Sequence, residues 1–371
     1  MIYFDNAATT SPINSLKAFY NPSSPHALGI KAERALRDAR KIIASALCSA
    51  NKPPSLQTIT ANTHYIPTPE EIIFTSGGTE SNNLAIIGYV LANQKSGVSL
   101  VSSPYEHPSL LAPIRFALER DWAVNEPVYA NNLVSFSHVN HETGDINDIN
   151  SISSEIKKNN PHAVILVDGA QGFCKEDIDL HNIDMYSFSG HKCHGPSGTG
   201  GLWVKKGIRI TPLQHGGGQE GNMRSGTENV PAIVQMAEAA ESLSQRLAYN
   251  RNHVAKIKAL MLSLQSNLTD VYVNTLSDNV SPYILNMSFM GVKGEILVHA
   301  LSEKGIYVSM GAACNSRKLK QSALSLMGFK QEIAQSAIRF SFSPFNTFEE
   351  AEKACEITYD TVKQLRNVMR K

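Results

Sequence analysis

The sequence predicts an α/β protein whose core is a mostly parallel β-sheet covered on both faces by helices. Between about residues 70 and 235, apolar runs of strand length alternate with segments that are long enough to form helices. Parallel strands require such crossover segments, and burial on both faces favours continuous apolar runs. At 371 residues the chain exceeds the size of one comfortable hydrophobic core, so we expect two domains.

The expected strands of this sheet follow one another in chain order. The first is EIIF (71–74), which ends at TSGGTE (75–80) and is followed by a helical pattern. The others are GVSLVSS (97–103), LVSFSHVN (133–140), AVILVDGA (163–170), MYSFSG (185–190) and GGLWV (200–204). Apolar residues at helical spacing predict a helix within residues 32–47. Residues 49–69 are polar and proline-rich, which indicates a surface insertion.

The second part of the chain alternates between helix and strand again. Residues 231–268 form a long helical stretch that is expected to bridge to a second domain. It is followed by strands YILNMSF (283–289), IYVSM (306–310) and AIRFSF (337–342), a helix from about Gly294, and an amphipathic C-terminal helix. We predict a large domain over residues 13–245 and a smaller domain over residues 246–371 together with residues 1–12.

Charge and cysteine usage narrow the function classes. A net charge of +1 provides no field that would attract nucleic acid or an anionic membrane, so a small-molecule ligand is expected. No apolar run approaches the roughly 18 residues of a membrane span, and Asp5 argues against a signal peptide. The five cysteines are scattered and lack CxxC spacing, which favours a reduced, cytoplasmic protein over a disulfide framework or a structural zinc site.

Three features follow predicted strands and could bind an anionic cofactor or carry chemistry. TSGGTE (75–80) could hold a phosphate at the start of a helix, or it could be a tight turn capped by Thr79. Asp168 ends its strand, where it could bind a metal, orient a histidine, neutralise a cationic ring or serve as a turn residue. His107 also follows a strand, where a lone histidine is more often structural than catalytic.

The stretch SFSGHKCHGPSGTGGL (187–202) admits three chemistries. His191, Cys193 and His194 could bind a metal, but they are too close together to converge easily, and no further ligand pattern supports them. The glycines could cradle a phosphate. Lys192, flanked by small residues, could form a Schiff base if its pKa were lowered, or it could be an ordinary surface lysine. A phosphate turn, an aspartate that ends a strand and a lysine beyond it are together the protein groups that pyridoxal 5'-phosphate requires.

The sequence as a whole resembles the cysteine desulfurases, which belong to the class V aminotransferase group of fold-type I pyridoxal-phosphate enzymes. The motifs that carry the resemblance occur in order along nearly the whole chain: DNAATT (5–10), NPSS (21–24), FTSGGTESNNLAI (74–86), EH (106–107), HVNHETG (138–144), VDGAQ (167–171), SFSGHKCHGP (187–196), HGGGQEGNMRSGTEN (215–229), ILNMSF (284–289), GAACNS (311–316) and SAIRFSF (336–342). The resemblance implies a large domain with a mostly parallel seven-stranded sheet and a smaller α/β C-terminal domain.

The resemblance also implies which residues bind the cofactor. Lys192 would form the Schiff base, Asp168 would hold the ring nitrogen, and His107 would stack on the ring. Gln171 would bond the ring oxygen, and His141 would bind the cofactor at a position where family members usually have asparagine. The phosphate would be held by Gly78, Thr79, Ser189, His191 and, from the neighbouring subunit of a homodimer, Thr227.

The implied reaction converts L-cysteine to L-alanine. Arg339 would bind the substrate carboxylate, Asn21 would lie near the substrate, and Cys314 would accept the sulfur as a persulfide. The sulfur would pass to an acceptor protein for iron–sulfur cluster, thio-cofactor or thiolated tRNA synthesis, with a possible transient cluster contact at Cys314. A selenocysteine lyase or aminotransferase of the same fold, or an inactive scaffold, is the alternative. No metal, membrane or direct nucleic-acid partner is expected.

Overall fold

A computed structural model describes residues 1–15, 17–48, 65–125, 132–310 and 322–369. These residues form two compact units. The larger unit contains Ser11–His138 and Asn147–Arg246, and the smaller contains Met1–Thr10, Val139–Ile146 and Leu247–Lys371. These units differ from the predicted domain boundaries in residues 139–146, which belong to the smaller unit although they lie within the predicted large domain. Residues 11–12 and 246 belong to the larger unit although they were expected in the small domain. The two-domain division itself stays a prediction.

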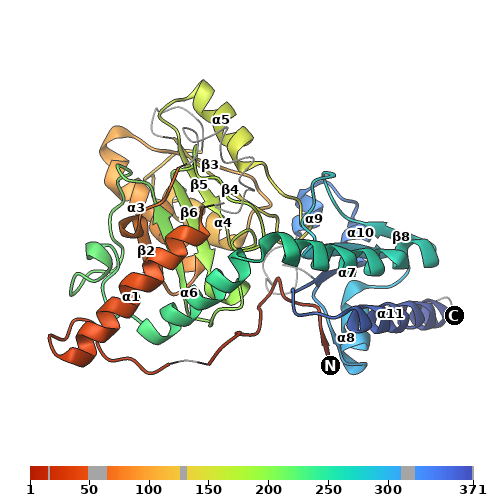
Figure 1. Ribbon diagram of the computed structural model, residues 1–371. Coiled ribbons are helices and arrows are strands. Elements are labelled where there is room, and N and C mark those ends of the chain that lie inside the picture. The colour runs from red at the N-terminus through yellow and green to blue at the C-terminus, as the bar shows by residue number, and fades with distance from the viewer. Residues whose placement is uncertain (16, 49–64, 126–131, 311–321, 370–371) are drawn as a thin grey trace, which may run out of the picture. The chain divides into compact units, whose positions relative to one another are not determined.

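The larger unit contains a mixed, mostly parallel sheet (Figure 1). Among the described residues it has six strands, in the order β2-β7-β6-β5-β4-β3, where the resemblance implies seven. Strand β7 is antiparallel to both of its neighbours, and the other neighbouring pairs are parallel. All six strands coincide with the predicted runs, at Ile72–Thr75 (β2), Ser99–Ser102 (β3), Asn132–Ser137 (β4), Val164–Asp168 (β5), Met185–Ser189 (β6) and Gly200–Val204 (β7).

Helices cover both faces of this sheet, as predicted. In β2, Ile72 and Phe74 pack in the core that lies beneath α1 and α6, whereas Ile73 packs in the core beneath α3 and α4. Successive side chains of a strand point to opposite faces, so a strand buried on both faces is apolar throughout. The covering helices are α1 (Ala27–Ala46), α5 (Ile149–Asn159) and α6 (Val230–Ser244) on the first face, and α3 (Gly78–Asn93) and α4 (Pro108–Leu118) on the second.

The predicted helical stretch over residues 231–268 consists of two helices. Helix α6 ends at Ser244, and α7 (Leu247–Asn267) begins the last segment of the smaller unit. Each helix buries its own apolar stripe in a different core: Ile233, Met236, Ala240 and Leu243 for α6, and Val254, Ile257, Met261 and Leu264 for α7. Hydrophobic spacing did not predict the break, because both stripes follow the same helical period.

The smaller unit has its own sheets and core. Strands β11 (Ala337–Ser341), β9 (Ile284–Phe289) and β8 (Val271–Val273) form an antiparallel sheet, in which β9 is central. The N-terminal strand β1 (Ile2–Tyr3) pairs in parallel with β10 (Ile306–Tyr307). The helices of this unit are α7, α8 (Gly294–Glu303), α9 (Ala323–Leu326), α10 (Gln331–Gln335) and α11 (Phe348–Met369).

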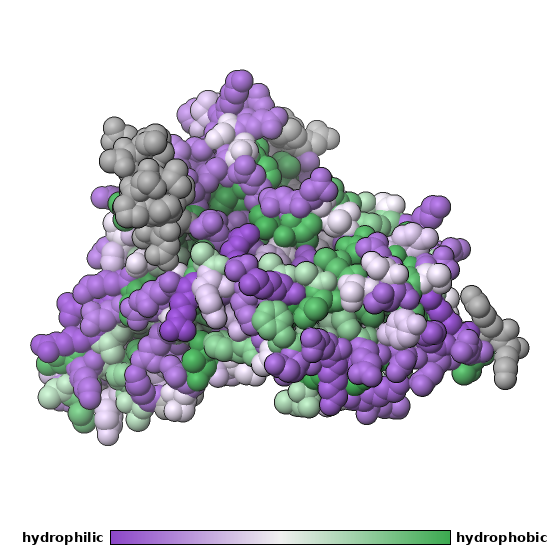
Figure 2. All heavy atoms as spheres, turned by 45° about the vertical axis from the view of Figure 1, so that its right-hand side comes forward, coloured by the Kyte–Doolittle hydropathy of each residue, from purple (hydrophilic) through white to green (hydrophobic). Residues whose placement is uncertain are grey.

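Short 3₁₀ helices occur between these elements. They are η1 (Pro69–Glu71), η2 (Gln94–Ser96), η3 (Gly190–Lys192) and η4 (Glu220–Asn222). On the face seen in Figure 2, hydrophilic side chains are interspersed with hydrophobic ones. Within the described residues, no helix combines the length and the apolar character that crossing a membrane requires.

Candidate functional site

The parallel strands of the larger unit end at one edge of the sheet, and the predicted cofactor residues gather there. Asp168 is the last residue of β5 and lies in register with Ser137 of β4 and Ser187 of β6. Ser189 ends β6, and Thr75 ends β2. The carboxyl edge of an open α/β sheet is where such folds bind their ligands. The sheet therefore brings the phosphate turn, Asp168 and the Lys192 segment together.

The turn after β2 is shaped by glycine. Gly77 has φ +154°, which side chains rarely adopt, and α3 begins directly after it at Gly78. A Cβ on Gly200 of β7 would lie 2.6 Å from the Cα of Gly77, so only a glycine at position 200 lets the turn approach β7. Ser189 borders the turn, since a Cβ on Gly78 would lie 3.7 Å from its Cβ. Backbone N–H groups at a helix N-terminus favour an anion, so this turn fits a phosphate.

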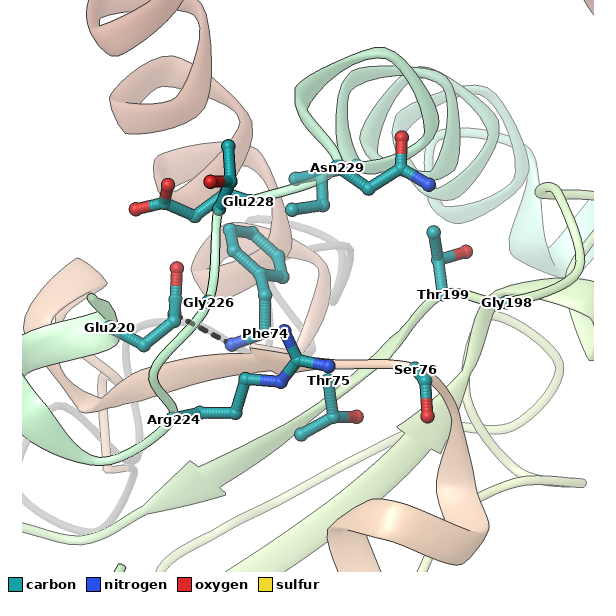
Figure 3. Close-up of a pocket in the computed structure, with 12 residues that line it drawn as sticks. Phe74, Thr75, Ser76, Gly198, Thr199, Glu220, Arg224, Gly226, Glu228 and Asn229 are labelled. Atoms are coloured by element: carbon teal, nitrogen blue, oxygen red, sulfur yellow. Dashed lines mark hydrogen bonds between the residues drawn. The ribbon is translucent and has the colours of Figure 1, made fainter. Parts of the chain in front are cut away.

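A pocket of about 240 Å³ lies beside this turn (Figure 3). Ser76 and Arg224 line it, and Thr227 of the RSGT segment lines it as well. Arg224 lies against the first turn of α3, because its Nε donates to Oε1 of Glu80 at 2.9 Å. The structure thus brings the RSGT segment to the phosphate turn of the same chain, and the role of Thr227 in a neighbouring subunit stays a prediction.

The Asp168 carboxylate is buried and is held by neutral donors. Its Oδ2 accepts a hydrogen bond from Nδ2 of Asn82 at 2.9 Å, and its Oδ1 accepts one from the backbone N–H of Ala170 at 3.0 Å. The pKa of Glu106 is raised by burial and further by the negative charge of Asp168. In the described part of the chain, no cationic side chain forms an ion pair with Asp168. A buried carboxylate in this setting fits a protonated ring nitrogen.

Gln171 is oriented by a lysine that the sequence reasoning missed. Nζ of Lys175 donates to Oε1 of Gln171 at 3.0 Å, and both residues are buried. An ammonium group is only a donor, so it fixes which end of the Gln171 amide is the oxygen. The other end of the amide is then the nitrogen, which is a donor and suits a ring oxygen. Lys175 follows Gln171 by four positions, and this spacing is the signal in the sequence that could have indicated the pair.

Lys192 follows β6 in helix η3, next to a histidine that stays neutral. The pKa of His191 is lowered to about 4 by burial and by the positive charges of Lys192 and Lys175. His191 is therefore uncharged near neutral pH and can donate one N–H to a phosphate.

Cys193 and His194, which were considered with His191 as metal ligands, contact two different parts of the chain. Sγ of Cys193 donates to the Gly190 carbonyl at 3.3 Å, and Nδ1 of His194 lies 2.8 Å from the Ser11 carbonyl. The residues that the structure describes contain no cluster of three or more metal-ligating side chains.

His107 lies exposed at the start of α4. It is the residue before Pro108, and its Nδ1 accepts a hydrogen bond from the backbone N–H of Ser109 at 3.1 Å. This imidazole therefore caps the helix with one nitrogen. Asn21 lies elsewhere in the larger unit, in the turn before α1, where its Oδ1 accepts from the Ser23 backbone N–H at 2.9 Å.

The predicted substrate arginine lies in the smaller unit together with His141. Arg339 is buried on β11, and its Nη1 donates to the His141 carbonyl at 2.6 Å. Its Nη2 lies 3.3 Å from Oδ1 of Asp5, and Oε1 of Glu142 lies 3.8 Å from Nη1. The Nε atom is buried without a hydrogen-bond partner among the described residues. Cys314, which the resemblance implies as the sulfur acceptor, lies outside the described residues.

Comparison with known proteins places the chain among relatives along nearly its full length. The sequence profile described as Aminotransferase class-V matches residues 2–125 and 125–353. The chain is 36% identical, over 402 aligned positions, to cysteine desulfurase IscS of Buchnera aphidicola subsp. Acyrthosiphon pisum (strain 5A), covering 99% of this chain and 94% of that protein. It is also 36% identical to cysteine desulfurase IscS of Pseudomonas putida (strain W619), with the same coverage of both chains.

Solved structures share the fold. A structure described as a NifS-like protein superposes with a TM-score of 0.84 at 30% identity, covering 100% of this chain and 99% of that one. A NifS-like protein from Rickettsia africae ESF-5 superposes with a TM-score of 0.80 at 28% identity, covering 97% of this chain and 99% of that one. These similarities confirm the predicted α/β fold class.

Proposed function

Because this chain belongs to the class-V aminotransferase family, we propose that it is a cysteine desulfurase, which converts L-cysteine to L-alanine and passes the sulfur on. The observation that carries this proposal is the similarity at 36% identity, over nearly the whole chain, to relatives named cysteine desulfurase. The geometry of the larger unit supports the cofactor chemistry that such an enzyme requires, since a buried anion and a glycine-lined helix N-terminus lie at one sheet edge.

The groups at this edge fit pyridoxal 5'-phosphate. Asp168 would hold the protonated ring nitrogen, Gln171 the ring oxygen, and Lys192 the aldehyde carbon, while His107 would contact the ring face. The phosphate would be held by Gly78, Thr79, Ser189 and His191. When bound, the cofactor stabilises negative charge at the α-carbon of an amino acid. The fit rests on the chemistry of the Asp168 donors and on the glycine turn, which a Cβ at position 77 would strain.

The protein's own groups would bind the substrate and move its protons. Lys192 would remove the proton from the substrate α-carbon as a general base. Arg339 would bind the substrate carboxylate, and Asn21 would lie near it. The carboxylates of Asp5 and Glu142 already lie near the Arg339 guanidinium. A substrate carboxylate would therefore bind beside them or displace one of them. His141 would contact the cofactor, and the backbone carbonyl of this residue anchors Arg339.

Cys314 would accept the sulfur. Its thiolate attacks the substrate sulfur, an S–S bond forms, and the carbon–sulfur bond breaks with its electron pair staying on the three-carbon fragment. A proton taken up by that carbon completes alanine, and Cys314 is left as a persulfide. A free thiol has a pKa of about 8.5, so only a small fraction is thiolate near neutral pH, and a nearby base such as His107 would have to raise that fraction.

We further propose a homodimer, in which Thr227 reaches the phosphate site of the partner. The acceptor of the persulfide sulfur would be a protein of iron–sulfur cluster, thio-cofactor or tRNA thiolation synthesis, with a transient cluster contact at Cys314. A cytoplasmic location is proposed from the cysteine usage of the sequence.

The decisive experiment incubates purified protein with L-cysteine and follows alanine release together with the mass of the peptide that contains Cys314. We expect alanine and a mass increase of one sulfur on that peptide. Cys314→Ala should keep the cofactor absorbance but form no persulfide. Cys48→Ala, which removes a different thiol, should behave like the wild type. Persulfide formation by Cys314→Ala at the normal rate would refute the role of Cys314. Absence of alanine from the wild type, or release of a keto acid, would refute the desulfurase activity.

A further inference from the structure

We propose that Asn82 and Ser109 form a hydrogen-bond relay that positions Asp168 and His107 together, with Nδ1 of His107 as the acceptor at its end. The proposal rests on the function assigned above, in which Asp168 holds the ring nitrogen and His107 contacts the ring. Neither Asn82 nor Ser109 would touch the reacting atoms, so both are positioning residues.

Asn82 lies at the centre of the relay. It is completely buried on α3, and its Nδ2 donates to Oδ2 of Asp168 at 2.9 Å and to Oγ of Ser109 at 2.9 Å. An amide nitrogen has two hydrogens, so both are used. The opposite amide orientation would place an oxygen against the Asp168 carboxylate, which only accepts hydrogen bonds, so chemistry selects the orientation observed. The amide oxygen is buried and has no hydrogen-bond partner among the described residues.

Ser109 passes this orientation to His107. Its hydroxyl oxygen accepts from Asn82, so its own hydrogen is available for Nδ1 of His107, which lies 2.8 Å away. The backbone N–H of Ser109 also donates to Nδ1 at 3.1 Å. A backbone N–H is always a donor, so Nδ1 must be the unprotonated nitrogen. Neutral His107 therefore carries its proton on Nε2.

The relay connects Asp168 and His107, the two residues proposed to contact the cofactor ring, through the buried side-chain amide of Asn82. Asp168 is the last residue of β5, whereas His107 precedes α4, so the backbone alone does not join them. The Asn82 amide donates directly to the Asp168 carboxylate on one side. On the other side it donates to the Ser109 hydroxyl, which in turn donates to Nδ1 of His107. Asn82 thereby fixes the position of the Asp168 carboxylate, and Ser109 supplies two donors to Nδ1 of His107, its hydroxyl and its backbone N–H. A shift of either end would leave a buried polar group of the relay without its partner, which is costly.

The first test uses cofactor-free protein and does not depend on catalysis. Long-range ¹H–¹⁵N NMR spectra of histidine-labelled protein report which ring nitrogen carries the proton, and His107→Gln identifies the signal. We expect the proton of His107 on Nε2 in the wild type and in both Ser109 variants, because the backbone N–H at position 109 remains a donor to Nδ1. The Nδ1 signal should keep its chemical shift in Ser109→Thr, which keeps the hydroxyl, and should shift in Ser109→Ala, which loses one of the two donors. A wild-type proton on Nδ1, or a Ser109→Ala spectrum identical to that of the wild type, would overturn the relay.

The second test measures binding of pyridoxine 5'-phosphate, which has the ring and phosphate of the cofactor but no aldehyde for Lys192. We expect Asn82→Leu to bind it about tenfold more weakly, because Asp168 loses one of its two donors. Asn83→Leu is the matched control on the same helix, since Nδ2 of Asn83 donates only to the neighbouring Thr79 carbonyl in the described residues. Equal affinity in Asn82→Leu and Asn83→Leu would overturn the relay. Thermal unfolding of each variant separates this result from misfolding.

These outcomes are distinct from failure of the proposed function. If the wild type releases no alanine from cysteine yet shows the Nε2 tautomer and the selective effect of Asn82→Leu, the desulfurase activity is refuted and the relay stands. If the wild type is a desulfurase but the Nδ1 signal of His107 does not respond to Ser109→Ala, the relay is refuted and the activity stands.

Discussion

Asp168 of the larger unit and Arg339 of the smaller unit are two buried charges with opposite surroundings. The Asp168 carboxylate accepts hydrogen bonds from an amide side chain and a backbone N–H, which are both neutral. The Arg339 guanidinium has two carboxylates within 4 Å and a backbone carbonyl on Nη1. Burial of a lone charge is costly, so its surroundings indicate whether the fold itself supplies the counter-charge.

These surroundings indicate that the two charges have different roles. Asp168 lacks a protein cation in the described part of the chain, so a cationic ligand would supply the missing charge. Arg339 is largely neutralised by its own unit, so it is a structural residue as well as the proposed substrate contact. Removal of Asp168 should therefore mainly affect cofactor chemistry, whereas removal of Arg339 should also affect folding.

The largest effect is expected from Lys192→Ala. Lys192 would hold the aldehyde of the cofactor and transfer the substrate proton, so alanine release from L-cysteine should fall by about three orders of magnitude or more. Lys205→Ala is the control, because Lys205 is another half-buried lysine whose Nζ donates to the His181 carbonyl. Turnover by Lys192→Ala within tenfold of the wild type would contradict the site.

Asp168→Asn should separate chemistry from stability. The asparagine keeps the shape but removes the charge, so activity should fall by about two to three orders of magnitude. The free energy of unfolding of the cofactor-free protein should change by only about 1 kcal/mol, because loss of charged hydrogen bonds is offset by relief from burying an anion. Denaturant unfolding and alanine release measure the two quantities. A loss of stability without a loss of activity would reverse the interpretation of Asp168.

Arg339→Met should affect both properties. It removes the cation near Asp5 and Glu142, so the free energy of unfolding of the smaller unit should fall by about 3 kcal/mol. If Arg339 also binds the substrate carboxylate, KM for L-cysteine should rise more than kcat falls. Arg339→Lys keeps the charge but not the planar fork, so it should recover stability more than KM. Unchanged stability in Arg339→Met would mean that its carboxylate neighbours do not depend on it.

The smallest effect is a loss of stability at mildly acidic pH. Burial lowers the pKa of His194 to about 4, from an ordinary value of 6.5. Between these values the unfolded chain binds a proton that the folded protein does not, so stability falls as the pH drops through 6.5 and stops falling near 4. This histidine should contribute about 2 kcal/mol of that loss between pH 7 and 5. Urea unfolding at both pH values tests it, and His194→Gln should show a smaller difference than the wild type.

Much of the candidate site could be predicted because it follows local sequence rules. Asp168 and Ser189 end apolar strands, and the Gly77–Gly78 turn separates a strand from a helix, so their place at the sheet edge follows from strand order. Lys192 was predicted from its small neighbours and its position after a strand. Cys314, Asn21 and Arg339 depended on resemblance, because nothing in their local sequence relates them to the other residues.

The fold class, the order of the strands along the chain and the residues at the strand ends follow from the amino-acid sequence, since hydrophobic period and turn residues are local properties. Packing in three dimensions is needed to divide residues 231–268 into two helices, to place Lys175 against Gln171, and to connect Asp168 with His107 through Asn82 and Ser109. These features depend on which side chains become neighbours after residues far apart in sequence are packed and desolvated. A hydrogen bond between Asn82 and Asp168, 86 positions apart, leaves no periodic signal along the chain.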